Sequence, residues 1–199
     1  MTTTRPFIGS IGLTCHPKLQ RRLAPIKVFA PLDGPLPSKG LEPLVEGKKF
    51  ACTECGKCCT GAGEVWANTA ETKALAKNLG LSEAHFLKKF TKKYSKRPGW
   101  YLLQRKQGSG ECIFLANDKK RCLVYGARPT QCTTYPFWPE LMNDEMWSQE
   151  ASDVCEGINH PDAKEVDVAY AAQQLALSSA YTAEFDAAGA ARSSGRKRA

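Results

Sequence analysis

Cysteines are the residues of this sequence best suited to chemistry, and four of the nine lie in one short run. Residues 52–59 have the sequence Cys-Thr-Glu-Cys-Gly-Lys-Cys-Cys, a C-x2-C-x2-C-C pattern. Two-residue gaps let a turning backbone direct successive thiolates at one point, as iron–sulfur and zinc loops require. Gly56 can take the positive φ of such a turn. The run therefore predicts a metal-binding loop.

Four further cysteines follow on segments that would have to bring them to this loop. Residues 112–115 and 122–125 are short β-rich segments that flank a turn signal at Asn117-Asp118, which predicts a β-hairpin with a cysteine at the start of each strand. Pro129 can occupy the first turn of a short helix that directs Cys132 inward. The candidate metal ligands are Cys52, Cys55, Cys58, Cys59, Cys112, Cys122, Cys132 and Cys155.

Three interpretations of these eight thiols are open. We favour iron in an iron–sulfur cluster, because the first three cysteines match the opening C-x2-C-x2-C of ferredoxins, although Cys59 follows at once and no proline comes next. Zinc also accepts four thiolates, and spacing alone does not separate it from iron. Disulfides are the third interpretation, but the vicinal pair Cys58 and Cys59 is poorly placed to bond to itself. One centre with spare cysteines and two separate sites both fit the count.

The cysteine pattern as a whole resembles the CxxCxxCC zinc- or iron-chelating domain family, also known as YkgJ-like. The resemblance extends from about Phe50 to Gly157. It rests on the four-cysteine run and on Cys-Ile-Phe-Leu at 112–115, Cys-Leu-Val-Tyr-Gly-Ala-Arg-Pro-Thr-Gln-Cys at 122–132 and Tyr-Pro-Phe-Trp at 135–138. The resemblance implies metal binding by the equivalent cysteines and says little about a reaction.

Residues other than cysteine suggest no catalytic machinery. The core holds two histidines, His85 and His160, and no motif for a nucleophile, so a catalytic triad is not supported. Catalytic residues stay unassigned, and whether the chain is an enzyme is left open. We expect Arg128 and Tyr135 to lie near the metal, as hydrogen-bond donors to sulfur or to backbone carbonyls.

The N-terminal segment has the composition of an organelle-targeting peptide. Residues 1–32 contain five Lys or Arg, several hydroxyl side chains and no acid, and Val28-Phe29-Ala30 is similar to a plastid processing site. We predict a transit peptide over residues 1–30 and a location in the chloroplast, with the mitochondrion as the alternative. A basic tail without targeting meaning is the competing interpretation. Residues 31–49, which begin with a Pro- and Gly-rich stretch, are predicted to be a linker.

The formal net charge of +8 does not indicate a nucleic-acid partner, because it lies in the two ends of the chain. Residues 1–49 hold eight Lys or Arg against three acids, and residues 187–199 hold four against none, so residues 50–186 carry a net charge of −1. A lysine row from Lys88 to Lys96 is expected to be a solvated helix face, with an acidic or RNA partner as the alternative. The sequence has no run of about 18 apolar residues, so no membrane partner is expected either.

The fold class expected for residues 50–187 is α+β: a small cysteine-rich metal-binding domain with a short antiparallel hairpin and packed helices. Asn68 or Thr69 can cap a helix that ends before Gly80. Ser82 can cap a second helix, whose apolar stripe reaches Tyr94.

The C-terminal part of the domain completes this expected fold. Residues 100–104 are predicted to form a strand that leads to the hairpin. A long Ala-rich helix from Asp162 to about Ala187 is expected to close over the metal, and residues 188–199 to form a disordered basic tail.

Three functions fit such a domain. The first is an iron–sulfur protein that transfers electrons or supports a modifying enzyme. The second is a zinc-stabilised protein- or RNA-interaction module, and the third is a metal chaperone or storage protein. A protein partner is therefore left open. Because long apolar elements are few, we expect the metal to contribute heavily to folding.

Overall fold

The computed structural model describes residues 38–61 and 63–195, with side chains described as far as residue 190. The predicted transit peptide over residues 1–30 lies outside the described residues. The helices are α1 (Glu42–Val45), α2 (Thr69–Asn78), α3 (Glu83–Phe90), α4 (Thr130–Thr134), α5 (Asp144–Asp153) and α6 (Val168–Gly195), with short 3-10 turns η2 (Lys57–Cys59), η3 (Tyr125–Ala127) and η4 (Pro139–Leu141). The strands are β1 (Trp66–Asn68), β2 (Thr91–Lys93) and β3 (Trp100–Leu103). The expected α+β class is confirmed.

The three strands form an antiparallel sheet in the order β1-β3-β2. Leu102 of the central strand β3 is opposite Trp66 on one side and Lys92 on the other. The strand predicted from Trp100 is therefore confirmed. The edge strand β2 carries exposed lysines, and such charges keep an edge from pairing with another chain.

Two predicted helix starts are confirmed by their capping hydrogen bonds. The Asn68 side chain accepts from Glu71 N (3.0 Å), and the Glu71 carboxylate accepts from Asn68 N (2.9 Å), which completes a capping box at the start of α2. Ser82 Oγ accepts from His85 N (3.3 Å) at the start of α3. The second helix ends at Phe90, however, and Tyr94 follows strand β2 instead of extending the helical stripe.

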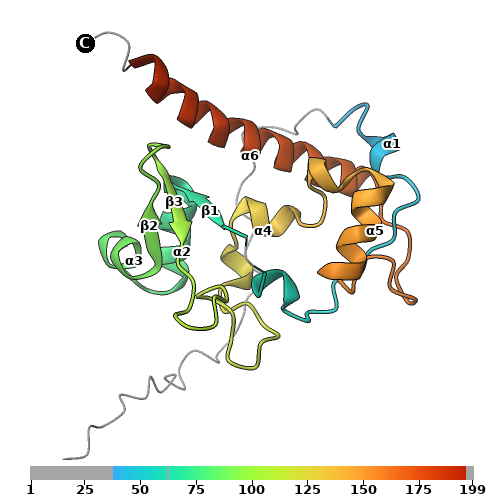
Figure 1. Ribbon diagram of the computed structural model, residues 1–199, viewed down its shortest axis with the longest axis horizontal. Helices are drawn as coiled ribbons and strands as arrows, with labels where there is room; N and C mark the ends of the chain where they lie inside the picture. Colours follow the sequence, from blue (N-terminus) through green and yellow to red (C-terminus); the bar gives the residue numbers. More distant parts are fainter. Residues whose placement is uncertain (1–37, 62, 196–199) are drawn as a thin grey trace, which may run out of the picture.

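Helix α6 spans the molecule and contributes to two separate apolar cores (Figure 1). Its first half buries Ala172 and Leu175 together with Val45 of α1 and Trp147 of α5. Its second half packs onto the sheet, where the Phe185 ring stacks on Trp66 with centroids 3.6 Å apart. A further core beneath the sheet contains Ala67, Leu75, Phe86, Leu103, Cys112, Phe114, Leu115 and Val124. Within the described residues, no helix is long and apolar enough to cross a membrane.

Three boundaries differ from those that the sequence suggested. Residues 31–49 are not simply a linker, because α1 lies there and Val45 is fully buried. Helix α6 starts at Val168, not at Asp162, because the preceding segment pairs with the start of the domain: Val166 N donates to Lys48 O at 3.0 Å. The helix also continues to Gly195, so residues 188–195 are helical where a disordered tail was expected.

The predicted β-hairpin forms as a short bent loop: Leu115 and Cys122 make an antiparallel bridge, and Leu123 N donates to Phe114 O and Ala116 N to Arg121 O, both at 2.8 Å. Each segment turns on itself, since Leu115 N donates to Cys112 O (3.0 Å) and Tyr125 N donates to Cys122 O (3.2 Å). Extended strands are therefore excluded there. The turn itself is confirmed, because Asp118 Oδ1 accepts from Lys120 N at 3.0 Å.

Candidate metal centre

The four-cysteine loop is held at both ends by close backbone packing. Before the first cysteine, Ala51 N donates to Gly157 O (3.0 Å). After the last two, Cys112 N donates to Cys59 O (2.8 Å). Between these attachments the chain reverses at Gly56, whose φ is +74°. The predicted role of this glycine in a tight turn is confirmed.

Five of the eight predicted ligands come together on one side of this turn. Cys58 and Cys59 lie on η2, Cys112 and Cys122 begin the two segments of the bent loop, and Cys132 lies on α4 (Figure 1). The Cys59 thiol hydrogen-bonds with the thiols of both Cys58 and Cys112. Cys122 and Cys132 each interact electrostatically with Cys112 and Cys58. We refer to Cys58, Cys59, Cys112, Cys122 and Cys132 as the five-thiol group.

The five thiols differ in the direction in which their pKa values are shifted. The hydrogen bond from Cys59 lowers the pKa of Cys112 to about 6 and is also the largest cause that lowers the pKa of Cys58 to about 7. The same hydrogen bonds raise the pKa of Cys59. Burial raises the pKa of Cys122 and of Cys132. Because thiolates are the form that binds metals, two of the five sulfurs are prepared for binding near neutral pH.

Two arginines supply positive charge to the five-thiol group. The positive charge of Arg128 lowers the pKa of Cys58, and that of Arg105 lowers the pKa of Cys112. The Arg128 guanidinium lies over the Tyr125 ring, 3.9 Å from its centroid. Within the described residues, Arg128 Nε and Arg105 Nη2 are buried without a hydrogen-bond partner. The expectation that Arg128 lies near the sulfurs is met, and two buried donors are left for an acceptor such as a cluster sulfur.

A second group of thiols lies on the other side of Gly56. Cys55 and Cys155 interact electrostatically, and Cys155 is buried in the core that contains Trp147. Burial is the main cause that raises the pKa of Cys155. Tyr135, the other non-cysteine residue expected near sulfur, hydrogen-bonds with Cys155, and its hydroxyl also donates to Glu150 Oε1 at 2.6 Å. Cys52 is exposed at the start of the same loop.

The thiols are grouped but not set in a finished coordination geometry. Within residues 38–61 and 63–195, no three His, Cys, Asp or Glu side chains are arranged to hold a metal ion as they stand. All eight thiols are free, and none is in a disulfide. His160 has its Nδ1 3.8 Å from the Asp162 carboxylate. The donor chemistry of the five-thiol group, with its two buried and unpartnered guanidinium nitrogens, fits iron or zinc.

Sequence reasoning missed Glu71, which binds the start of α4, the helix that carries Cys132. This buried carboxylate accepts from Thr130 N (2.7 Å) at the start of α4 and from the Tyr181 hydroxyl (2.6 Å) of α6. Its position three residues after Asn68 is the capping-box signal, and that signal would have identified a structural role. Neither Arg105 nor Glu150 was predicted to lie near the sulfurs.

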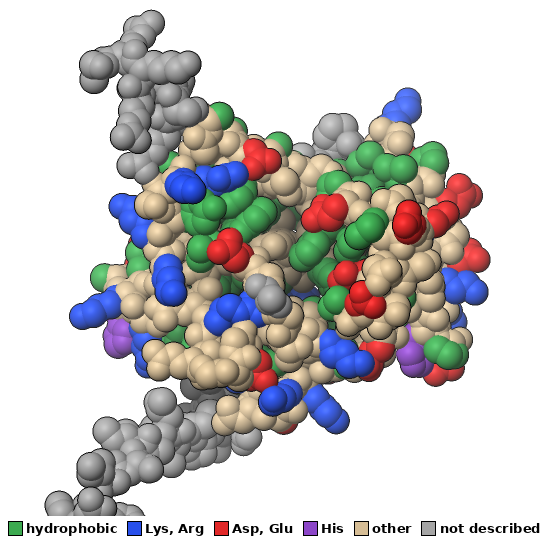
Figure 2. All heavy atoms as spheres, viewed as in Figure 1, with side chains coloured by type: hydrophobic (Ala, Val, Ile, Leu, Met, Phe, Trp, Pro, Cys, Tyr) green, Lys and Arg blue, Asp and Glu red, His purple; other side chains and the backbone are tan. Residues whose placement is uncertain are grey.

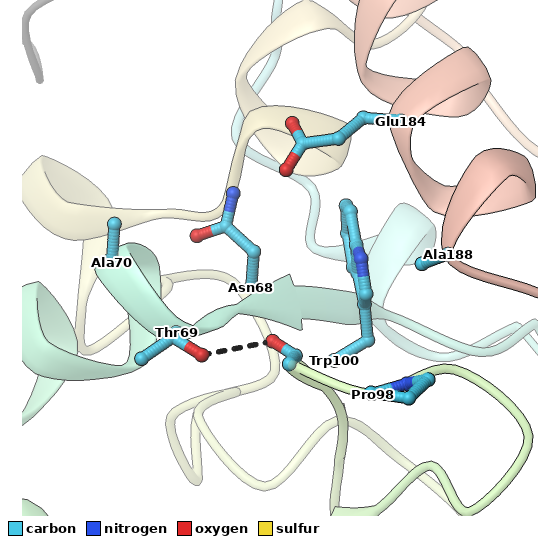
Figure 3. A pocket seen from close by; sticks show the side chains of 8 residues that line it. Asn68, Thr69, Ala70, Pro98, Trp100, Glu184 and Ala188 are labelled. Carbon is cyan, nitrogen blue, oxygen red and sulfur yellow. Dashed lines mark hydrogen bonds between the residues drawn. The ribbon is translucent and has the colours of Figure 1, made fainter. Parts of the chain in front are cut away.

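A pocket of about 460 Å³ lies elsewhere on the molecule, between the start of α2, the turn before β3 and α6 (Figure 3). Asn68, Trp100 and Glu184 line the pocket, and Thr69 Oγ1 donates to Gly99 O at 3.0 Å. No cysteine lines this pocket. Figure 2 shows Lys and Arg side chains mainly over the α3 and sheet side of one face and acidic side chains mainly over the α5 side. The pocket is therefore distinct from the two groups of thiols.

The fold and the cysteines together define a small α+β domain that brings free thiols from distant parts of the chain close to one another. Residues 51–156, just over half of the chain, match the CxxCxxCC family, described as "Putative zinc- or iron-chelating domain", and the chain belongs to this family. The matched range contains all eight candidate ligands.

The chain is also similar to a protein of Methanocaldococcus jannaschii named "Uncharacterized protein MJ0661". The two are 30% identical over 102 residues, which cover 51% of this chain and 52% of that protein. The chain thus spans about half the length of this relative. No solved structure matches the chain.

Proposed function

We propose that this chain is an iron-binding protein whose cysteines hold an iron–sulfur cluster. The observation that carries the proposal is the convergence of five thiols from three separate stretches of backbone, residues 58–59, 112–122 and 132. Soft thiolates are the ligands preferred by iron–sulfur clusters and by zinc. Membership in a family of zinc- or iron-chelating domains supports the same class of ligand.

The residues around the thiols have defined roles in this proposal. A bound cluster would supply redox chemistry or a structural centre. Cys112 and Cys58, with their lowered pKa values, would bind as thiolates without a large proton release. Arg105 and Arg128 would offset the negative charge of several thiolates and would donate hydrogen bonds to sulfur from nitrogens that otherwise have no partner.

Zinc is the alternative metal, and it would make the chain a zinc-stabilised interaction module. The backbone favours a structural role for any metal here, since residues 105–129 contain no helix or strand other than the single turn η3. A structural zinc contributes on the order of 10–16 kcal/mol of apparent binding free energy in small peptides, which is comparable with the stability of a whole domain.

One experiment separates iron from zinc. The chain without residues 1–30 is isolated anaerobically and analysed for iron, zinc and acid-labile sulfide, with electron paramagnetic resonance before and after reduction. Iron with sulfide in equal amounts and a reducible visible chromophore are expected. Colourless protein with stoichiometric zinc would refute the iron proposal and support the zinc module, and labile metal on an ordered apo chain would support a chaperone or storage role.

We also propose that the protein acts in the chloroplast. The acid-free, basic and hydroxyl-rich composition of residues 1–32 supports import. A fluorescent protein fused after Ala30 should accumulate in plastids, whereas mitochondrial or diffuse fluorescence would contradict the proposal.

A further inference from the structure

The first half of the four-cysteine loop follows a different part of the chain from the second half. Before Gly56, the loop runs beside residues 155–158: Phe50 bridges Ile158, and Thr53 Oγ1 donates to Glu156 at 3.0 Å. After Gly56, the loop joins the bent loop through Cys59 and Cys112. The C-x2-C-x2-C-C spacing therefore does not direct all four thiols at one point.

Two glycines fix this division by backbone contact. A Cβ on Gly157 would overlap the Ala51 carbonyl, and a Cβ on Gly56 would overlap the Lys119 carbonyl. Each half of the loop is thus packed directly against a different backbone segment. A slide of the loop that brought Cys55 to the five-thiol group would have to break one of these contacts.

The surroundings of the two groups are also distinct. Cys112 belongs to the core beneath the sheet, and Cys59 and Cys122 pack against that core. Cys155 belongs to the core formed by α1, α5 and the first half of α6. The five-thiol group has Arg105 and Arg128 beside it. Cys155 has Tyr135 and, through the tyrosine hydroxyl, Glu150, and the cation near it is Lys57, which pairs with Glu156.

We propose that the eight cysteines serve two metal sites, and that Cys52, Cys55 and Cys155 form a second, open site for a single thiophilic divalent ion such as Zn²⁺. The inference rests on the proposed metal-binding function and assigns the eight cysteine ligands to two sites. Glu54, between Cys52 and Cys55, has a φ of +55°, a turn conformation that curves the two-residue gap of a C-x2-C pair. Cys52 lies between Ala51 and Thr53, which hydrogen-bond to Gly157 and Glu156, so its exposed thiol is beside the segment that carries Cys155.

The chemistry of the second site follows from its ligands. Three thiolates leave one position of a tetrahedral zinc for water, which makes the ion accessible to chelators. Tyr135 acts as a positioning residue, because its hydroxyl contacts Cys155 and is itself held by Glu150. The five-thiol group supplies enough ligands for a closed centre without drawing on these three cysteines.

A matched pair of substitutions tests the division. Cys52→Ser and Cys58→Ser alter exposed cysteines of the same loop on opposite sides of Gly56, so neither substitution leaves a cavity in a core. Each variant of the full chain is loaded anaerobically, and two quantities are measured: the metal content per chain, and the zinc released to a chromogenic chelator in the first minutes.

The proposal predicts that substitutions in the two groups of cysteines lose different metal ions. Cys52→Ser and Cys155→Ser should lose the rapidly released zinc, about one ion per chain, and keep the slowly released metal and its spectrum. Cys58→Ser should lose the slowly released metal and keep the rapid zinc. If Cys52→Ser and Cys58→Ser lose the same metal to the same extent, or if Cys52→Ser loses none, the division is wrong while metal binding stands. If the unaltered chain takes up no metal, the proposed function fails as well.

Discussion

Replacing Glu71 by alanine tests how the fold positions Cys132. The Glu71 carboxylate is buried, and three donors converge on it: Thr130 N at 2.7 Å, Asn68 N at 2.9 Å and the Tyr181 hydroxyl at 2.6 Å. Alanine removes all three acceptor contacts at once, and only the Tyr181 hydroxyl keeps another acceptor among those described, Trp66 O at 3.0 Å.

The expected loss in the free energy of unfolding follows from the number of hydrogen bonds and from the charge of the Glu71 carboxylate. A hydrogen bond to a charged group contributes about 1.5–3 kcal/mol, and the Asn68 amide is only half-buried, so that water can replace part of its loss. We expect Glu71→Ala to lower the free energy of unfolding by about 4 kcal/mol, a large share of the 5–15 kcal/mol typical of a domain. Glu71→Gln should cost about 2 kcal/mol, because one acceptor oxygen is kept and the other becomes a donor facing a donor.

The assay is urea unfolding of metal-loaded protein followed by far-ultraviolet circular dichroism, with Glu83→Ala as the matched control. Glu83 also lies in the first turn of a neighbouring helix, but it makes only a 4.0 Å ion pair with Lys73 near the surface and should cost less than about 1 kcal/mol. Because Glu71 holds the start of the helix that carries Cys132, Glu71→Ala should also release metal faster to a chelator. Equal costs for Glu71→Ala and Glu83→Ala would refute the reasoning.

Three further predictions concern the loop, its ionisation and the metal. Gly56→Ala should lower the free energy of unfolding by about 3 kcal/mol and Gly80→Ala by about 1 kcal/mol, measured by urea unfolding, since both have positive φ but only Gly56 faces a carbonyl. In reduced, metal-free protein, alkylation of Cys58 should fall as pH falls through about 7. Since the folded pKa of Cys58 lies below its ordinary value of 9.0, ionisation favours the folded state fully above pH 9 and this gain is lost as pH falls through about 7, which pH-dependent urea unfolding can check. Chelation of the metal should open residues 105–121 to trypsin, whereas cleavage unchanged from the loaded protein would show that the metal does not order this segment.

Local signals in the sequence predicted local structure well. The caps at Asn68 and Ser82, the strand from Trp100, the turn at Asp118 and the glycine turn at Gly56 all form as expected. Each depends on hydrogen bonds or backbone conformations within a few residues, which composition and spacing encode directly.

Features that depend on distant partners were predicted poorly. Val45 was placed in a linker, yet it is buried by α6, more than a hundred residues later in the chain. Helix α5 was not predicted, although Asn143 caps it by accepting from Met146 N at 2.8 Å. The even spacing of the first cysteines suggested one point of convergence, because spacing records the reach of the backbone and not the contacts of Ala51 and Cys59 with different segments.

The C-terminal helix α6 supports α4, the short helix that carries Cys132. It was expected to close over the metal; it carries no cysteine, but it packs directly on α4, and a hydrogen-bonded connection to the start of α4 passes from the Tyr181 hydroxyl to Glu71 and from Glu71 to Thr130 N. Thr130 begins the short helix that carries Cys132, so the Glu71 carboxylate joins α6 to the start of α4. Because the first half of α6 packs on the core that buries Cys155, one rigid element supports both thiol groups. The placement of the two groups therefore depends on packing against α6 and on the Gly56 turn, which the cysteine spacing does not record.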